Sequence, residues 1–275
     1  MRFLRRTSPS PYVIGVSWPR SGHHLMARLL RLYYGPTFTY CGFYGQAGCC
    51  GKAPCARAGT VRYSKNHDFD GTLPQDAQHR YLIQTRAFAP SVVSNFELYL
   101  RECGQDDAAS FARFASAQFT PWRAFQDKWV TSEFARTQTV IPYEALIRDP
   151  ATALTYALTS FGTGDPDPAR LRTAIAGVDG EEVAQRRITP RPGSGVHAPR
   201  DVTQFRHYDA KLFGYLDKLI LTRQEVNRLF RRHLGRDAAE ANMLALQTSS
   251  SLDALERMIL GSSEYTSRGR TLRVV

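Results

Sequence analysis

The sequence predicts an α/β fold in which a parallel β-sheet is flanked by helices. Short runs rich in β-forming residues occur at 12–16, 80–85 and 139–142, as expected of strands covered on both faces. Stretches with helical periodicity separate these runs, and that alternation is typical of parallel sheets. The chain has 275 residues, which is enough for one full core and a small appended module. We therefore expect a main domain over 1–220 and a helical C-terminal extension over 221–275.

The stretch YVIGVSWPRSGHHLMARLL at 12–30 predicts a buried strand, a tight loop and an amphipathic helix. The helix opens at Ser21-Gly22 and ends at Gly35-Pro36. The first N–H groups of a helix lack intrahelical partners, and the helix dipole is positive there, so a strand, loop and helix in this order can bind an anion. The apolar face of the predicted helix is expected to comprise Leu25, Met26, Leu29, Leu30 and Tyr33.

The rest of the chain continues the alternation of strands and helices. In order, we expect an irregular loop over 36–63, an extended segment over 62–68, a strand over 80–85, a helix over 91–101, two helical pieces over 107–135 separated before Pro121, a strand over 139–142, a helix opened by Asp149-Pro150, an irregular loop over 177–207, one helix over 208–234, and one or two small amphipathic helices over 237–275.

The net charge of +11 is concentrated near the N-terminus. Residues 1–67 hold ten Lys or Arg and no Asp or Glu, whereas the remaining 26 basic and 25 acidic residues nearly balance. A positive surface around the loop would attract a multiply charged ligand. The alternative is a basic surface for nucleic acid or anionic lipid. Because no nucleic-acid-binding motif accompanies the charge, we expect no nucleic-acid partner, while peripheral contact with a membrane stays open.

Neither a membrane span nor a secretion signal is expected. No run of 18 apolar residues occurs, and the basic segment MRFLRRTSPSP lacks the apolar run and cleavage site of a signal peptide. The expectation is a cytoplasmic enzyme.

Four of the five cysteines lie close together in the sequence, at Cys41, Cys49, Cys50 and Cys55. Three interpretations of them stay open: zinc binding, a disulfide or redox pair, and reduced thiols in a Gly-rich loop.

The loop after the first strand is not the Gly-x4-Gly-Lys-Ser/Thr loop of nucleotide triphosphatases, because six residues separate Gly15 from Gly22 and His23 follows. Pro-Arg-Ser-Gly at 19–22 resembles instead the Pro-Lys-Ser-Gly-Thr-Thr loop of the PAPS-dependent sulfotransferases. PAPS, 3′-phosphoadenosine 5′-phosphosulfate, is their sulfuryl donor. The resemblance implies a P-loop-like sheet, a sulfotransferase-like domain over 1–220 and donor-phosphate binding by this loop. The implied loop ligands are Arg20, Ser21, Gly22, His23 and His24.

Three further segments follow in the family's order. Arg86 ends a strand and Ser94 lies eight residues later, which is the spacing with which the family holds the donor's 3′-phosphate. Charge and a directional hydroxyl suit that task, although an Arg at a sheet edge and a Ser on a helix surface are common without it. Tyr143, in IPYEALIRDP, resembles the family's adenine-contacting Tyr; a core tyrosine is the alternative.

The remaining segment is Lys65-Asn66-His67, which resembles the family's Lys-Thr-His or Lys-Ser-His. The resemblance implies that His67 is the catalytic base and that Lys65 lies beside the reacting sulfuryl group. A lone His is more often structural, but this one follows a short strand and a Lys. The family's late Arg-Lys-Gly clamp has only an inexact counterpart at Arg191 and Gly193.

The resemblance therefore implies a sulfotransferase that moves a sulfuryl group from PAPS to an acceptor hydroxyl or amine. Arg20 and Lys65 would neutralise the charge on the sulfuryl group, and no metal is expected. An acceptor in the class of small molecules, glycans or glycolipids fits the aromatic loop over 36–63. The alternatives are a P-loop kinase or nucleotidase that uses ATP and magnesium, and a non-catalytic basic binding protein. The sequence does not address the oligomeric state.

Overall fold

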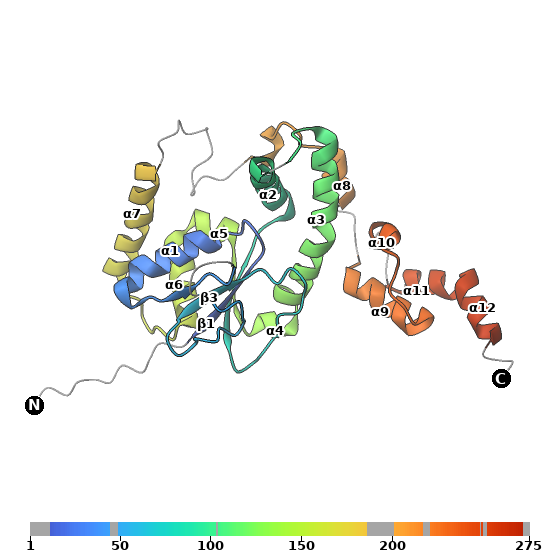
Figure 1. Ribbon diagram of the computed structural model, residues 1–275, viewed down its shortest axis with the longest axis horizontal. Helices are drawn as coiled ribbons and strands as arrows, with labels where there is room; N and C mark the ends of the chain where they lie inside the picture. The colour runs from blue at the N-terminus through green and yellow to red at the C-terminus, as the bar shows by residue number, and fades with distance from the viewer. Residues whose placement is uncertain are drawn as a thin grey trace, which may run out of the picture.

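A computed structural model describes residues 12–44, 49–102, 104–185, 201–216, 221–247, 249 and 252–271. Five parallel strands form one sheet with helices on both faces, and a group of helices follows at the C-terminal end of the chain (Figure 1). The expected α/β class and the helical C-terminal region are thereby confirmed. Among the described residues, no helix combines the length and the apolar character that crossing a membrane requires.

The sheet has the order β2-β3-β1-β4-β5, so the first strand is central. Gly15 of β1 pairs with Lys65 of β3 on one side and with Leu82 of β4 on the other. All five strands are parallel, so their carboxyl ends meet at one edge. Their bounds are β1 (Val13–Ser17), β2 (Tyr40–Cys41), β3 (Tyr63–Asn66), β4 (Arg80–Thr85) and β5 (Thr139–Pro142).

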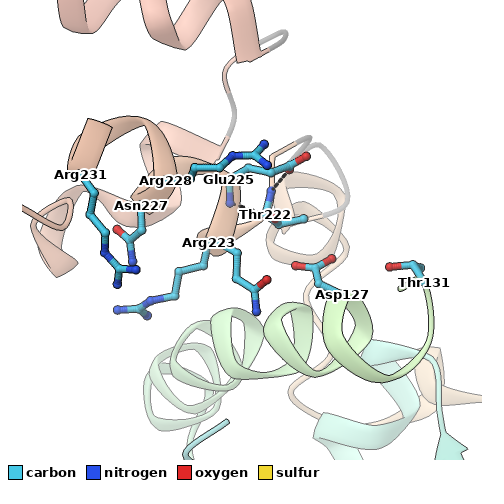
Figure 2. A pocket seen from close by; sticks show the side chains of 9 residues that line it. Asp127, Thr131, Thr222, Arg223, Glu225, Asn227, Arg228 and Arg231 are labelled. Atoms are coloured by element: carbon cyan, nitrogen blue, oxygen red, sulfur yellow. Dashed lines mark hydrogen bonds between the residues drawn. The ribbon is translucent and has the colours of Figure 1, made fainter. Parts of the chain in front are cut away.

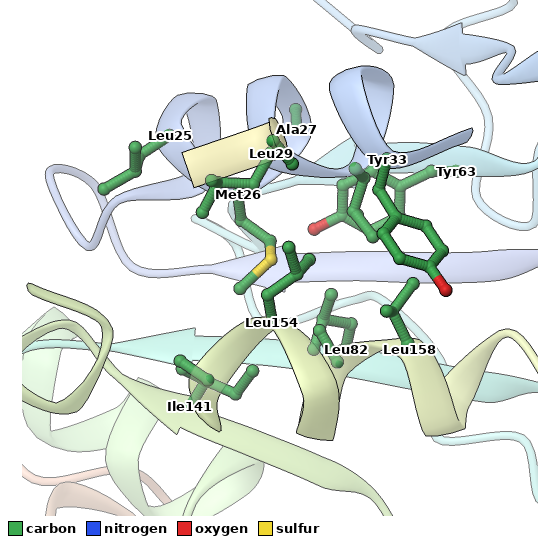
Figure 3. Close-up of a cluster of buried hydrophobic side chains, with 14 of the residues drawn as sticks. Leu25, Met26, Ala27, Leu29, Tyr33, Tyr63, Leu82, Ile141, Leu154 and Leu158 are labelled. Carbon is green, nitrogen blue, oxygen red and sulfur yellow. The ribbon is translucent and has the colours of Figure 1, made fainter. Parts of the chain in front are cut away.

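One face of the sheet is covered by α1 (His23–Tyr34), α6 (Pro150–Ser160) and α7 (Pro168–Gln185). Figure 3 shows the core that they share with the strands. The expected apolar face of α1 is confirmed, because all five of its side chains are buried: Leu25, Met26, Leu29, Leu30 and Tyr33.

The opposite face packs against α3 (Ala108–Trp129), whose Phe125 and Trp129 contact the strand side chains that point away from α1. Helices α2 (Phe88–Glu102) and α8 (Ala210–Leu216) pack against the first half of α3 in a third cluster. The short α4 (Glu133–Arg136) leads into β5.

The expected break before Pro121 is wrong, because α3 runs through it without interruption. A proline costs the helix one hydrogen bond and crowds the preceding turn. Here Phe111 and Phe119 are buried on one side of Pro121, and Phe125 and Trp129 on the other. Both halves are therefore fixed by burial, which outweighs the local penalty.

Three other element predictions need correction. The interval 36–63 is not wholly irregular, since it contains a 3₁₀ turn (Gly35–Thr37) and β2. The loop expected over 177–207 is wrong for its first nine residues, which belong to α7, because that helix packs along α1 and buries Ala174 and Val178. A short α5 (Tyr143–Arg148) also precedes the helix that Asp149 caps. Residues 186–200 lie outside the described residues; a 3₁₀ turn (Val202–Gln204) follows.

The single helix expected over 208–234 is two helices, α8 and α9 (Arg223–Leu234). Thr222 starts the second one with a reciprocal capping box to Glu225. The tail then forms α10 (Glu240–Gln247), α11 (Leu252–Leu260) and α12 (Ser263–Thr271), one more helix than expected. A hydrophobic cluster within 221–265 holds this group together. The expected boundary at residue 220 falls on 217–220, outside the described residues.

Gly15 allows β1 and β3 to approach closely. A Cβ atom at this position would lie 2.3 Å from the carbonyl oxygen of Ser64 and 2.7 Å from the ring of Tyr63. We expect Gly15→Ala to lower the free energy of unfolding by about 1–3 kcal/mol, because overpacked cores must move backbone or rotamers. Urea denaturation measures this. Gly59→Ala is the control, since no atom lies within 4 Å of its Cβ position; equal unfolding free energies for the two variants would contradict the prediction.

Candidate functional site

The described members of the predicted site lie at or near the carboxyl ends of β1, β3, β4 and β5. The helix after β1 covers one face of the sheet, while the helices after β4 lead to the other face. The two connections therefore diverge between these neighbouring strands. In open parallel sheets, ligands bind at such a point, outside the carboxyl ends of the strands.

The loop from Trp18 to Gly22 turns sharply into α1. Arg20 has a φ of 65° and Gly22 a φ of 82°, both in the left-handed region. Gly22 precedes the first turn of α1 and provides no side-chain cap for its N–H groups. The buried Oγ of Ser21 has no hydrogen-bond partner among the described residues. Loop and helix thus present polar hydrogens and a hydroxyl of the kind that an anion satisfies.

Hydrogen bonds join Arg20, Arg86 and Ser94. Nη1 of Arg86 donates to the carbonyl oxygen of Arg20 over 3.1 Å, and Nε of Arg20 donates to Oγ of Ser94 over 3.0 Å. The backbone of Arg86 is held in turn by Trp122 of α3, whose Nε1 donates to the Arg86 carbonyl oxygen over 3.0 Å. Two cations and a hydroxyl from three separate segments are therefore brought together.

Tyr143 completes this group from the start of α5. The guanidinium carbon of Arg86 lies 4.2 Å from the centre of its ring, in cation–π geometry. The ring also lies so close to Gly22 that a Cβ atom there would be 2.7 Å from Cδ2 of Tyr143. The loop glycine is thus required by its positive φ and by its tyrosine neighbour.

His67 follows β3 and bonds to the end of β1. Its Nδ1 lies 2.6 Å from the carbonyl oxygen of Ser17, which can only accept, so Nδ1 carries the proton and donates. Nε2 then has the lone pair that a general base requires. The ring of Tyr44 stacks on His67 at 5.6 Å, and the Tyr44 hydroxyl accepts the backbone N–H of His67 over 3.0 Å.

The surroundings keep His67 neutral. Burial, together with the nearby Lys65 and His24, lowers its pKa to about 4 against the opposing hydrogen bond to Ser17. Burial also lowers the pKa of Lys65, whose Nζ lies 3.4 Å from Nε2 of the exposed His24. Burial and the charge of Lys65 also lower the pKa of His24, so the Lys65 ammonium, and not a second imidazolium, is the positive charge that favours a bound anion here.

His23 does not join Lys65 and His24. It is buried, with Nε2 3.0 Å from the Tyr40 hydroxyl and Nδ1 3.4 Å from the Tyr63 hydroxyl, and it stacks on Tyr63. Burial holds its pKa well below the usual value. The structure therefore places this member of the predicted loop set in a tyrosine cluster. The predicted clamp residues Arg191 and Gly193 lie outside the described residues.

A hollow of about 340 Å³ lies next to the segment that carries His67, although His67 itself is not among its lining residues. It is lined by the aromatic rings of Phe43, Tyr44 and Phe69 and by residues on both sides of His67 in the chain, Asn66 and Asp68. Phe69 is 63% exposed and its ring lies 5.2 Å from that of His67. Because aromatic and polar side chains line it together, this hollow has the character of a small-molecule or sugar subsite.

A larger hollow, of about 830 Å³, lies elsewhere (Figure 2). Its walls are Asp127 and Thr131, at the end of α3, and the first turns of α9, with Arg228 and Arg231. Burial raises the pKa of Asp127 to about 6. None of the site residues predicted from the sequence lines it.

Sequence reasoning missed Ser17, Tyr44 and Trp122. Ser17 contributes its backbone carbonyl oxygen, and its Oγ also lies 3.2 Å from Nδ1 of His67; a serine at the end of a strand carries no sequence signal for either contact. Tyr44 could have been found only as an aromatic residue in the Gly-rich loop. Trp122 acts through its indole N–H from a helix 36 residues after Arg86, and that distance hides the contact.

No protein-family model matches the chain, and no curated protein matches it.

Proposed function

We propose that this protein is a sulfotransferase with a P-loop-like fold that moves a sulfuryl group from PAPS to an acceptor hydroxyl or amine. The observation that carries the proposal is the junction of Arg86 with the backbone of Arg20 and of Arg20 with Ser94. These residues belong to the two segments whose resemblance assigns them to opposite ends of one nucleotide. Their contact across 66 and 74 residues of sequence supports a single donor site.

The chemistry requires a base, a cationic environment and an acceptor subsite. The acceptor oxygen or nitrogen attacks sulfur, the bond between sulfur and the bridging oxygen breaks, and adenosine 3′,5′-bisphosphate leaves. Nε2 of His67 takes the acceptor proton. Arg20 and Lys65 stabilise the charge that develops on the bridging and sulfuryl oxygens. Binding both reactants in line supplies much of the rate, as in phosphoryl transfer.

The hollow beside His67 suggests where the acceptor binds. Its aromatic rings can pack against the face of a sugar or a phenol, and its polar groups can orient hydroxyls. A glycan, a glycolipid headgroup or a small phenol therefore fits the site. Contact with a membrane surface would bring a glycolipid acceptor to the basic N-terminal region.

The direct test is binding of adenosine 3′,5′-bisphosphate without added metal. We expect this ligand to raise the melting temperature, because it binds the folded state alone, and to bind at least about tenfold more tightly than adenosine 5′-monophosphate. The comparison isolates the 3′-phosphate. Calorimetric titration gives both dissociation constants.

Two outcomes would overturn the proposal. A preference for magnesium ATP over the bisphosphate would identify a kinase or nucleotidase instead. Equal affinity for the bisphosphate and the monophosphate would show that no 3′-phosphate site exists. Transfer of labelled sulfate from PAPS to a glycan or lipid extract then separates a catalyst from a non-catalytic binding protein.

A further inference from the structure

Four cysteine sulfurs meet in the connection between β2 and β3. Cys41 belongs to β2, and Cys49, Cys50 and Cys55 belong to the loop that follows. The Sγ atoms of Cys41 and Cys49 are 3.3 Å apart, and those of Cys50 and Cys55 are 3.4 Å apart. The Sγ atoms of Cys41, Cys50 and Cys55 all lie within 4.8 Å of one another, whereas Cys49 is not part of this group of three.

These distances describe one cluster and not two independent pairs. A disulfide has an S–S distance of about 2.05 Å, and none of the four described cysteines forms one. Two separate disulfides would not need Cys41 to lie against both Cys50 and Cys55. A tetrahedral ion does need this, because Zn–S bonds of about 2.3 Å place the sulfurs about 3.8 Å apart.

Backbone N–H groups point to the sulfurs. The amide of Ala56 donates to Sγ of Cys50 and that of Arg57 to Sγ of Cys55, both over 3.4 Å. The backbone of Phe43 and of Cys50 also bonds to Cys41. Donors of this kind stabilise negative sulfur and orient it, as the outer shell of a metal site does.

The loop is anchored to the sheet next to the sulfurs. The amide of Cys55 donates to the hydroxyl of Tyr12 over 2.8 Å, and that hydroxyl lies 2.7 Å from Oγ of Ser64 in β3. The positions of Cys41 and Cys55 are therefore tied to neighbouring strands before any ion binds. Such preorganisation lowers the cost of forming a metal site.

We propose that Cys41, Cys49, Cys50 and Cys55 bind one zinc ion as thiolates in a closed, structural site. Cys41, Cys50 and Cys55 supply three soft sulfur ligands around one centre, and Cys49, next to Cys41, can supply the fourth; such ligands favour zinc over hard cations. Each Zn–S bond forms as a thiol gives its proton to solvent, so up to four protons are released and no sulfur changes oxidation state. The argument for this site does not rest on the proposed sulfuryl transfer.

The zinc site has a consequence for the neighbouring candidate site. Tyr44 lies between Cys41 and Cys49 in the chain, and its ring stacks on His67. An ion bound at both ends of this short segment restricts where Tyr44 can lie. Loss of the ion is therefore expected to loosen the aromatic wall of the hollow beside His67.

The test is the zinc content of the full chain, purified under reducing conditions without a chelator. Plasma mass spectrometry should find about one zinc per chain. Cys41→Ser and Cys50→Ser should each reduce this content at least about tenfold. Cys103→Ser is the matched control, because it removes the remaining cysteine, and it should keep the zinc.

The outcomes that would overturn the site are specific. In a second preparation, purified and denatured without reductant, metal-free protein with one reactive thiol per chain would mean that the four cysteines form two disulfides. Metal-free protein with all five thiols reactive would mean reduced cysteines without an ion. If the serine variants do not fold, cobalt titration of the wild-type chain decides: a tetrahedral thiolate spectrum supports the site, and its absence excludes it.

Discussion

His67→Asn is expected to reduce sulfuryl transfer about 10²–10⁴-fold, the usual contribution of a general base. The Asn amide can still donate to the carbonyl oxygen of Ser17, as Nδ1 of His67 does over 2.6 Å. It has no lone pair equivalent to Nε2, so the variant removes the proposed base and retains the anchoring bond. Initial rates with saturating PAPS measure the loss.

Bisphosphate binding separates the catalytic role from a structural one. The dissociation constant for adenosine 3′,5′-bisphosphate should change less than about threefold in His67→Asn, because His67 contacts neither Arg86 nor Ser94 in any described bond. His79→Asn is the matched control; its side chain bonds to Asp76 before β4, at the opposite edge of the sheet, and transfer should stay unchanged. Full transfer by His67→Asn would exclude this histidine as the base.

The depressed pKa of His67 gives this variant a second signature. The folded protein holds the imidazole neutral down to about pH 4, whereas the unfolded chain protonates it near 6.5. Its contribution to stability is therefore complete above pH 6.5 and is lost as the pH falls toward 4. Because Asn does not titrate, His67→Asn should lose less stability over this interval than the wild-type protein.

The contrast between His23 and His67 shows how far the sequence leads. The periodicity of apolar residues and the local composition identify the strand before His67 and the helix that begins at His23, because strand and helix formation depend on neighbouring residues in the sequence. Whether an imidazole faces tyrosines or solvent depends on which strands become neighbours. Tyr40 and Tyr63, which bond to His23, belong to β2 and β3, and the sequence did not predict β2.

The missed helix α7 has a similar cause. Its sequence contains Gly177 and Gly180 and only a weak apolar stripe, so local propensity argues against it. It is helical because Ala174 and Val178 are buried against α1, and Gly177 lets Leu32 approach. Such tertiary stabilisation is invisible until the packing partner is known. The hydrogen bond from Trp122 to Arg86 could not be predicted for the same reason.

Replacement of Arg86 tests the donor site most directly. Arg86→Met is expected to weaken binding of adenosine 3′,5′-bisphosphate about 100-fold or more, because it removes a buried cation that would pair with phosphate. Affinity for adenosine 5′-monophosphate should fall much less, since the proposed partner of Arg86 is the 3′-phosphate. The ratio of the two dissociation constants, from calorimetry, is therefore the decisive measurement.

Arg86 also has structural contacts, and Arg80→Met controls for them. Arg80 begins the same strand at its other end, where Nη1 donates to the carbonyl oxygens of Thr159 and Ser160 over 3.3 and 3.2 Å. Its loss removes a cation and two hydrogen bonds to backbone carbonyls without touching the loop. If both variants weaken the two nucleotides equally, Arg86 acts only through the fold; if Arg86→Met alone loses the preference for the bisphosphate, the end of β4 recognises the 3′-phosphate.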